Sequence, residues 1–316
     1  MPTRRVSTTL ARGALGTLGV GVGCLAYAGL YEVRAFILRR VQVPVLPPGA
    51  PSIRVLQVSD LHLTPSARAR QSWVAGLAAL QPDLVINTGD NLAHPDAVPY
   101  VLRSLGRLLD VPGVYVWGSN DYYGPTFKNP LAYLVRPSEP RGTPKRELPW
   151  QELGAGFTRA GWTDLTHRRT TLDILGVRIG LRGTDDGHLG LARYDTVAGA
   201  VDRDAADVSL AVTHAPYREL LDPMAADGHD LIVAGHTHGG QVCVPGYGAL
   251  VTNCDLDTRR VKGLSQHTAG GHTSWLHVSA GLGTSPYAPI RFACRPEATL
   301  LTLTPRENAE HPPTMG

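Results

Sequence analysis

The 316-residue chain contains little lysine, few aromatic side chains and few cysteines. Three Lys accompany 27 Arg and 27 acidic residues, so the formal net charge is only +3, and no long basic block occurs. This balance argues against a nucleic-acid binder that works through bulk positive charge. Cys24 lies in an apolar run, and the three remaining cysteines are an odd number that provides no disulfide framework. With 43% hydrophobic residues the chain can bury a large core, which excludes a disordered tail or a disulfide miniprotein.

An uncharged stretch of eighteen residues occupies positions 13–30. A helix of this length, at about 1.5 Å per residue, nearly matches a hydrocarbon core of about 30 Å. Four interpretations compete: a cleaved export signal ending at Ala26-Tyr27-Ala28, an uncleaved anchor, a lipoprotein site at Cys24, and a buried core helix. Arginines lie on both sides of the stretch, so they give no orientation. We expect a protein at the cell membrane with a single N-terminal anchor, or an exported one.

The expected domain organisation follows from these composition changes. Residues 1–31 form the signal or anchor segment, and the Pro-rich residues 32–52 form an extended stem. The folded domain is expected to cover residues 53–304. Residues 305–316 have the composition of a flexible tail.

From residue 53 onward, short apolar runs alternate with helix-like segments. Such alternation implies a parallel sheet covered by helices. Residues 122–149 are rich in proline and lack periodicity, so we expect an irregular insertion there. Later strand-like runs have hairpin spacing, which makes the architecture mixed α/β (α+β). The expected strands are 53–58, 83–87, 113–117, 171–175, 177–182, 208–213, 231–234, 241–244, 275–279 and 298–303, and the expected helices are 66–80, 97–109 and 150–160.

Five expected strands end in residues that divalent ions prefer as ligands. In α/β folds ligands collect beyond the carboxyl ends of strands, where loops converge. Asp, His and Asn at these ends are hard-to-borderline metal ligands. Each fragment alone is weak, but a structural explanation for the ordered set of five is improbable. The fragments are Ser59-Asp60-Leu61-His62, Thr88-Gly89-Asp90-Asn91, Gly118-Ser119-Asn120-Asp121, His214, and Gly235-His236-Thr237-His238-Gly239-Gly240.

These fragments resemble the five ordered motifs of the calcineurin-like metallophosphoesterases. The resemblance covers roughly residues 53–303, and the runs GHTHGGQ and GLGTSPYAPIRF are similar to bacterial exported or membrane-anchored members. It implies a four-layer αββα sandwich of two mixed β-sheets, with a dinuclear metal site at one edge. It also implies two divalent metal ions, Mn, Fe or Zn, and hydrolysis of phosphodiester or phosphomonoester bonds by a metal-bridging hydroxide.

The resemblance assigns the ligands residue by residue. Asp60, His62 and His238 go to one ion, His214 and His236 to the other, and Asp90 bridges them. A carboxylate can hold two cations about 3.5–4 Å apart while it compensates their charge. Such a site needs no Ser or Cys nucleophile.

The third motif departs from the family pattern, which usually reads Gly-Asn-His-Asp/Glu. In one interpretation the loop shifts by one residue, so that Asn120 supplies its amide oxygen to the metal and Asp121 lies near the usual His position. In the other, Ser119 or water replaces the ligand and Asn120 only donates a hydrogen bond to the phosphate. Either way the family's imidazole is missing, and general acid catalysis is typically worth 10²–10⁴-fold. We therefore expect a preference for leaving groups that depart without protonation, unless His94 or His188 substitutes.

The remaining expectations concern partners and supporting residues. The substrate is expected to be a phosphorylated small molecule or a lipid or cell-wall phosphate, with nucleic acid an improbable partner. The alternatives are a catalytically impaired binder of phosphorylated envelope molecules, or a nuclease. The run Gly281-Leu282-Gly283 is expected either to wall the site or to form a plain turn. Arg291 is a further candidate for contacting phosphate, and Cys243 and Cys254 flank a turn and could pair in an exported protein.

Overall fold

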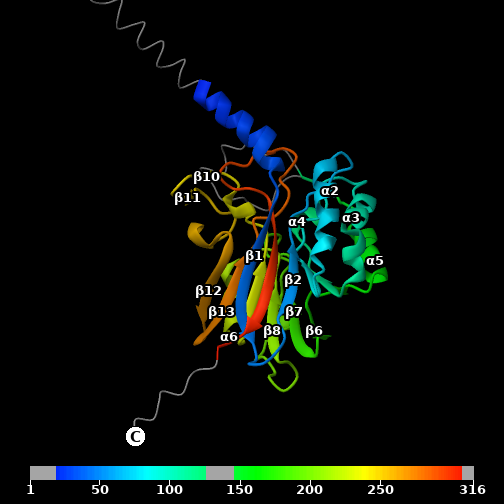
Figure 1. Ribbon diagram of the computed structural model, residues 1–316, viewed down its shortest axis with the longest axis vertical. Helices are drawn as coiled ribbons and strands as arrows, with labels where there is room; N and C mark the ends of the chain where they lie inside the picture. Colours follow the sequence, from blue (N-terminus) through cyan, green and yellow to red (C-terminus); the bar gives the residue numbers. More distant parts are fainter. Residues whose placement is uncertain (1–18, 126–145, 308–316) are drawn as a thin grey trace, which may run out of the picture.

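The computed structural model describes residues 19–125 and 146–307 (Figure 1). Two six-stranded sheets form most of the domain. The first has the order β1-β14-β2-β3-β4-β5, in which only β14 and β2 pair antiparallel. The second has the order β12-β13-β9-β8-β7-β6, in which the outer pairs β12–β13 and β7–β6 are antiparallel and the inner ones parallel. Both sheets are therefore mixed.

The elements have the following bounds. The strands are β1 (Ile37–Leu46), β2 (Ile53–Val58), β3 (Leu84–Asn87), β4 (Gly113–Tyr115), β5 (Thr163–Asp164), β6 (Arg168–Ile174), β7 (Val177–Gly183), β8 (Val208–Val212), β9 (Leu231–Ala234), β10 (Cys243–Val244), β11 (Gly248–Ala249), β12 (Gly263–Ala269), β13 (His272–Val278) and β14 (Glu297–Pro305). The α-helices are α2 (Arg68–Gly76), α3 (Val98–Leu105), α4 (Ser119–Tyr122), α5 (Trp150–Arg159) and α6 (Arg218–Ala226). The shorter 3-10 and π segments are η1 (Tyr27–Tyr31), η2 (Glu32–Arg34), η3 (Leu77–Leu80), η4 (Gly106–Asp110), η6 (Tyr194–Thr196), η7 (His238–Gly240) and η8 (Thr258–Arg260).

The main core lies between the two sheets. Apolar residues of β2, such as Ile53 and Val55, share one buried cluster with Val208 and Leu210 of β8. The outer face of the first sheet packs against α2, α3 and α5 and forms a second apolar cluster with them. Phe157 of α5 is fully buried in this second cluster. Helix α6 covers the outer face of the second sheet. Two mixed sheets with helices outside match the layer order that the sequence resemblance implies.

Strand β1 corrects the expectation that residues 32–52 form a stem outside the domain. It pairs in parallel with β14 from Ile37 onward, and Val43, Val45 and Leu46 are buried in the core between the sheets. The prolines that favoured a stem are compatible with this strand because β1 lies at the edge of its sheet, where Pro44 costs no ladder hydrogen bond to a further strand.

Two other elements are weakly indicated by the sequence. Strand β12 is an edge strand with mostly polar side chains, so its burial pattern is weak. Helix α6 contains Pro223, a residue that normally ends a helix. Both elements are held by tertiary contacts, since α6 packs against β12 and β13.

The N-terminal part of the described chain is helical over residues 19–26 and continues through η1 and η2. It projects from the domain, as Figure 1 shows, and its base packs on the segment before β14, where Arg291 N–H donates to Ala28 O. Across residues 19–125 and 146–307, no helix combines the length and apolar character needed to cross a membrane. Residues 1–18, most of the insertion (126–145) and most of the expected tail (308–316) lie outside the described residues.

Candidate metal centre

The predicted ligands come together from loops that follow strands of both sheets. Asp60 and His62 follow β2, and Asp90 follows β3 in the first sheet. From the second sheet, His214 follows β8, and the loop after β9 carries His236 and His238. All six side chains belong to buried residues. The sequence argument that strand ends converge is therefore confirmed for these positions.

Asp60, His62 and His238 form the first group of ligand atoms. His62 Nε2 lies 3.2 Å from His238 Nε2, and His238 Nε2 lies 3.8 Å from Asp60 Oδ1. His62 Nε2 is also 3.4 Å from Oδ2 of Asp90. This spacing fits several donors arranged around one cation.

A second group consists of Asp60, Asp90 and His214, whose ligand atoms lie within 4.8 Å of one another. His214 Nε2 is 3.6 Å from Asp90 Oδ2 and 3.3 Å from His236 Nδ1. Asp90 Oδ2 therefore approaches an imidazole of each group. This is the position expected of a carboxylate shared by two ions.

The chemistry of the donors fits divalent cations. Asp60 Oδ1 is buried without a hydrogen-bond partner, and an unpaired buried carboxylate oxygen is costly unless a cation compensates it. Burial lowers the pKa of His62 to about 4, which keeps its ring neutral, and neutral imidazole is the form that binds metal. Burial opposes ionisation of Asp90, but the charge of His214 and the Asn120 N–H groups hold the pKa of Asp90 well below its usual range. The protonation states of these side chains therefore suit the binding of a cation.

Hydrogen bonds to backbone carbonyls orient two of the rings. His214 Nδ1 lies 2.7 Å from Thr88 O, and His236 Nε2 lies 3.3 Å from Asn253 O. A ring N–H that donates to a carbonyl leaves the other ring nitrogen free as a metal ligand. The free atoms, His214 Nε2 and His236 Nδ1, are the two that face each other.

The ligand-bearing backbone is strained. Asp60, His62, Asp90, His236 and His238 have φ values of 51°, 39°, 56°, 69° and 49°, in the left-handed region that non-glycine residues rarely occupy. Strain of this kind persists only where the surrounding structure enforces it, and it clusters at functional sites. The concentration of backbone strain at these five residues indicates that the fold holds their side chains in a particular arrangement.

The third motif lies against Asp90. The backbone N–H of Asn120 donates to Asp90 Oδ1, and its side-chain amide donates to Oδ2, both at 2.7 Å. Ser119 Oγ is 3.3 Å from the same amide nitrogen. Gly118 precedes them with its Cα facing the site, and an added Cβ would meet Asp90 Oδ1 first and lie 2.6 Å from His214 Cε1. The structure thus brings Asn120 to the second group.

Asp121 does not face the site, against the expectation that it lies near the usual His position. Its carboxylate accepts hydrogen bonds from the backbone N–H groups of Asp90 (2.7 Å), Asn91 (2.8 Å) and Gly118 (3.1 Å). Asp121 is fully buried, and these bonds tie the second motif to the third. Its geometry is that of a positioning residue.

The two histidines considered as replacement acids are placed differently. The side chain of His94 is 44% exposed. Its Nδ1 accepts a hydrogen bond from the backbone N–H of Asp96 and lies 3.7 Å from the Asp96 carboxylate. His188 lies beside the centre, with its ring centroid 4.8 Å from that of His236 and Nδ1 3.0 Å from Tyr217 OH. Only His188 of this pair contacts the ligand cluster in the described structure.

Arg291 is fully buried and does not point at a substrate from the surface. Its guanidinium donates to the carbonyls of Ala280 and Gly283, each at 2.7 Å, and Nη2 lies 3.3 Å from His238 Nδ1. Arg291 therefore contacts the His238 ring on the side away from Nε2 and helps to fix its orientation. Gly281 of the same region is packed so closely on Asp60 that an added Cβ would lie 2.6 Å from the Asp60 Cβ, which makes this run a wall of the site.

The cysteines are free thiols in the described structure. Cys243 donates to Gly239 O at 3.3 Å, and Cys294 lies 3.4 Å from the same carbonyl. The expected partner of Cys243, Cys254, instead contacts Thr252. The proposed Cys243–Cys254 pairing is wrong because folding places Cys294 beside Cys243.

Sequence reasoning missed the loop after β7. Asp186 is fully buried there and accepts hydrogen bonds from His188 N and Leu189 N, at 3.0 and 3.2 Å. Burial raises the pKa of Asp186 to about 7. The rule that found the other motifs applies to this strand end as well, because Asp185 and Asp186 come shortly after the end of β7.

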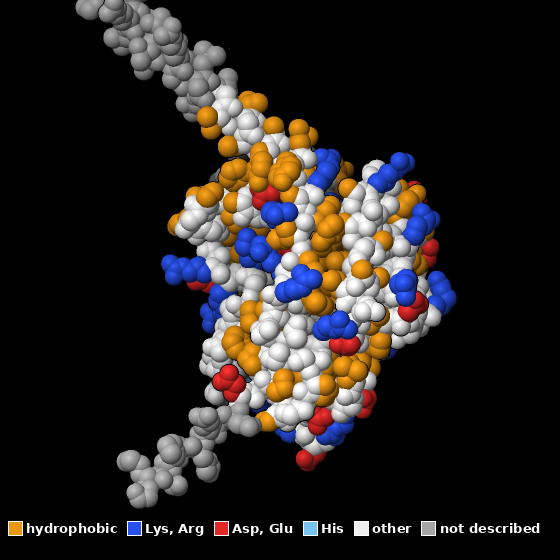
Figure 2. Space-filling view, viewed as in Figure 1, with side chains coloured by type: hydrophobic (Ala, Val, Ile, Leu, Met, Phe, Trp, Pro, Cys, Tyr) orange, Lys and Arg blue, Asp and Glu red, His pale blue; other side chains and the backbone are white. Residues whose placement is uncertain are grey.

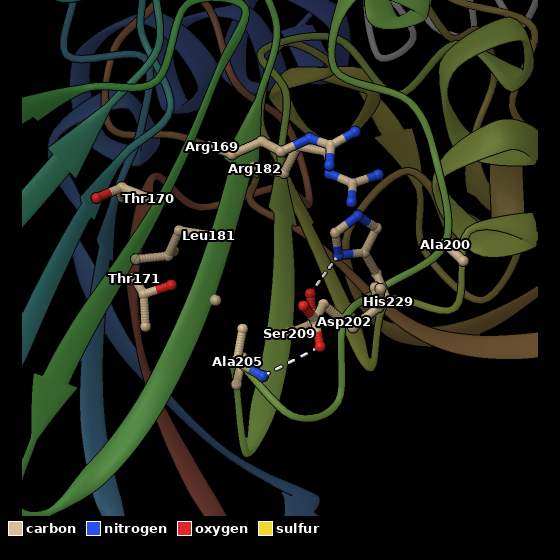
Figure 3. A pocket seen from close by; sticks show the side chains of 13 residues that line it. Arg169, Thr170, Thr171, Leu181, Arg182, Ala200, Asp202, Ala205, Ser209 and His229 are labelled. Carbon is tan, nitrogen blue, oxygen red and sulfur yellow. Dashed lines mark hydrogen bonds between the residues drawn. The ribbon is translucent and has the colours of Figure 1, made fainter.

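A separate cavity of about 140 Å³ lies on the second sheet, lined by residues of β6, β7 and β8 (Figure 3). Two of its polar side chains already have partners: Arg182 bonds to Asp227, and His229 Nδ1 lies 2.7 Å from Ser209 Oγ. These groups hold the neighbouring loop together. The cavity contains none of the predicted ligands.

Comparisons with known proteins agree with this geometry. A model of the calcineurin-like phosphoesterase family matches residues 53–240. The uncharacterized metallophosphoesterase YkuE of Bacillus subtilis is 27% identical over 307 residues, which is 93% of each chain. The phosphodiesterase YaeI of Escherichia coli is 26% identical over 291 residues, 90% of this chain and 93% of that protein. Among solved structures, TT1561 of Thermus thermophilus has 12% identity and a TM-score of 0.40 over 73% of this chain and 91% of that one, a similarity too low to bear on activity.

Proposed function

This chain belongs to the calcineurin-like phosphoesterase family and is a hydrolase of phosphoric esters, and we propose that it cleaves phosphodiester or phosphomonoester bonds with two divalent metal ions. The observation that carries the proposal is the buried convergence of two Asp and four His residues. Asp60 belongs to both groups of donors, and Asp90 Oδ2 lies 3.4 Å from His62 and 3.6 Å from His214.

The proposed ligands are those that the strand ends bring together. Asp60, His62 and His238 hold one ion, and His214 and His236 hold the other, with Asp90 shared and Asn120 as a further ligand. Ions bound in this way activate water near neutral pH and neutralise charge that develops on phosphate oxygens. The donors suit Mn, Fe and Zn alike.

The protein's own residues fix the position of these donors. Asn120 holds both oxygens of Asp90, and Asp121 clamps the backbone on either side of that contact. Arg291 contacts the ring of His238 and is itself held in place by its hydrogen bonds to the carbonyls of Ala280 and Gly283. Preorganised ligands of this kind keep the reacting groups in place, where errors of about 1 Å are costly.

His188 is proposed to assist the leaving group in place of the family's missing imidazole. Its support is its position beside His236 and its contact with Tyr217. The substrate is proposed to be a phosphorylated small molecule or a lipid or cell-wall phosphate. We also propose that the protein acts at the cell membrane or outside it, on the basis of the uncharged N-terminal stretch.

Hydrolysis of bis(p-nitrophenyl) phosphate with added Mn²⁺ tests the proposal. Asp90→Asn removes the negative charge that both groups of donors share. Metal-dependent turnover should therefore fall by about 10²-fold or more, the size of effect typical when one electrostatic contact to the reacting groups is lost. Asp96→Asn is the matched control, because Asp96 is 79% exposed beside His94 and should leave turnover unchanged. A wild-type chain that binds metal but shows no metal-dependent turnover would refute the enzymatic function and favour a binder of phosphorylated molecules.

A further inference from the structure

The described chain exposes large apolar side chains in an uneven way. Ten of thirteen such residues come from only three segments, and each of the ten is at least 42% exposed. We call this set the apolar collar: Val20, Val22, Leu25, Tyr27, Leu30, Tyr31, Val244, Tyr247, Leu250 and Tyr287. Figure 2 shows hydrophobic side chains gathered where the N-terminal helix meets the domain.

The three segments of the apolar collar are joined through the stretch between Ala288 and Phe292. Gln241 Nε2 donates to Ala288 O at 2.9 Å, and Cys243 N donates to Phe292 O at 2.8 Å. On its other side this stretch meets the N-terminal helix, where the rings of Phe292 and Tyr27 pack edge to face at 6.0 Å. The β10–β11 hairpin, the loop before β14 and the N-terminal helix are therefore neighbours, and Figure 1 shows these segments at one end of the molecule.

The three segments that form the apolar collar carry positive charge, and the exposed Asp255 and Asp257 follow the second of them. In residues 19–46, 239–254 and 279–296 the one acidic side chain is Glu32, which is buried and accepts the N–H groups of Ala293 and Cys294. Arg34 and Arg295 are exposed beside it. A surface of this composition complements an anionic lipid headgroup layer.

The chain outside the described residues continues the same chemistry. The uncharged stretch begins at Gly13, six positions before the helix of residues 19–26, and it is preceded by Arg4, Arg5 and Arg12. Tyrosines next to aliphatic residues, with arginines at the edge, are the composition of a segment at the boundary between acyl chains and headgroups. A soluble partner protein or a second copy would not require this continuity between the domain surface and the terminal apolar stretch.

We propose that the apolar collar docks the folded domain onto the surface of an anionic lipid bilayer. The β10–β11 hairpin and the loop around Tyr287 then lie in the headgroup layer beside the N-terminal helix. Docking is distinct from tethering by the terminal segment, because a tether alone leaves the domain free to turn. The loop that carries His236 and His238 leads directly into β10, so docking also holds the metal centre next to the membrane surface.

Quenching of an added tryptophan by brominated acyl chains tests the proposal with the full chain. Tyr247→Trp and Tyr287→Trp are compared in vesicles of phosphatidylcholine and phosphatidylglycerol, with and without bromine on the acyl chains. The unsubstituted chain gives the background of its five tryptophans. The matched control is Leu175→Trp, because Leu175 is 58% exposed in the β6–β7 turn, at the end of β7 opposite the site loop.

A docked collar places its side chains about 5–10 Å into the boundary region. The fluorescence added at positions 247 and 287 should be lost with brominated lipid, while that added at position 175 should be kept. Equal quenching at positions 247 and 175, or no association with the vesicles, would refute docking. A concentration-dependent blue shift at position 247 without bromine quenching would show that a second copy covers the collar, which also overturns the proposal. The assay reads no catalysis, so its outcome is independent of whether the chain hydrolyses phosphodiesters.

Discussion

Replacing Gly118 with alanine should disable the metal centre without straining the backbone. Gly118 has φ −113° and ψ 168°, an extended conformation that alanine adopts freely. The added Cβ, however, would meet Asp90 Oδ1 most closely and would lie 2.6 Å from Cε1 and 2.7 Å from Nδ1 of His214, whereas ordinary contact begins at 3.4 Å. Asp90, the His214 ring or the substituted loop must therefore move, and the contact with the His214 ring alone requires about 0.8 Å, the difference between 3.4 and 2.6 Å.

A shift of this size is large for a metal ligand. Coordination distances in protein sites hold to within about 0.2 Å, so the displaced His214 can no longer complete its site. We expect loss of about one ion per chain and a fall in turnover on the order of 10²-fold, with a stability cost of about 1–3 kcal/mol from overpacking. Metal analysis after dialysis, turnover of bis(p-nitrophenyl) phosphate and urea unfolding measure the three effects.

The control for this substitution is Gly76→Ala. Gly76 lies at the end of α2, where an added Cβ meets nothing within 4 Å. Alanine there should leave metal content and turnover unchanged and alter stability by no more than about 1 kcal/mol. If Gly118→Ala binds metal and turns over substrate as the wild type does, then Gly118 and His214 do not have the close approach on which the reasoning depends.

Three further predictions concern Asp121, His188 and His277. Asp121→Ala leaves three buried N–H groups without an acceptor at about 1–3 kcal/mol each, so urea unfolding should show severe destabilisation; a fully stable variant that has lost only turnover would instead indicate a catalytic role. His188→Ala should slow hydrolysis of alkyl phosphodiesters about 10²-fold or more and nitrophenyl ones less, with His94→Ala as the unaffected control; equal slowing of both substrates would contradict a role at the leaving group. Burial lowers the pKa of His277 to about 4, so below pH 6.5 the unfolded chain binds more protons and stability falls by about 3 kcal/mol as the pH approaches 4. His277→Gln should remove this part of the pH dependence in urea unfolding with chelator present, and an unchanged pH profile would show that the buried ring does not cause it.

The strand ends explain why so much of the site was predictable. Asp60, Asp90 and His214 each follow an apolar run that must be a buried strand, and parallel strands bring such ends to one edge. The same rule applied to β7 would have found Asp186. His94 failed as a candidate because closeness in sequence to Asp90 does not place a side chain in the same cluster.

Other errors came from local signals that tertiary contacts override. Pro44 suggested a stem, yet β1 completes the edge of the first sheet beside β14. Asp121 resembled a catalytic residue by position, but the helix that starts at Ser119 turns its carboxylate back onto three backbone amides. Arg291 was indistinguishable from surface arginines, because only folding shows which guanidinium lies under His238.

By itself the sequence determined the alternation of strands and helices and the strand ends that carry Asp, His and Asn, because hydrophobic periodicity and ligand chemistry are local properties. The layers and the assignment of the six metal-ligand candidates were implied by its resemblance to the calcineurin-like metallophosphoesterases. The tertiary structure decided which side chains share Asp90, which arginine supports His238, and which uncharged segments meet in the apolar collar. Those relations join residues that are distant in the sequence, by 47 positions for Gln241 and Ala288 and by 176 for His62 and His238. The ligand contacts among them are fixed by the packing of one sheet on the other. No local pattern contains them.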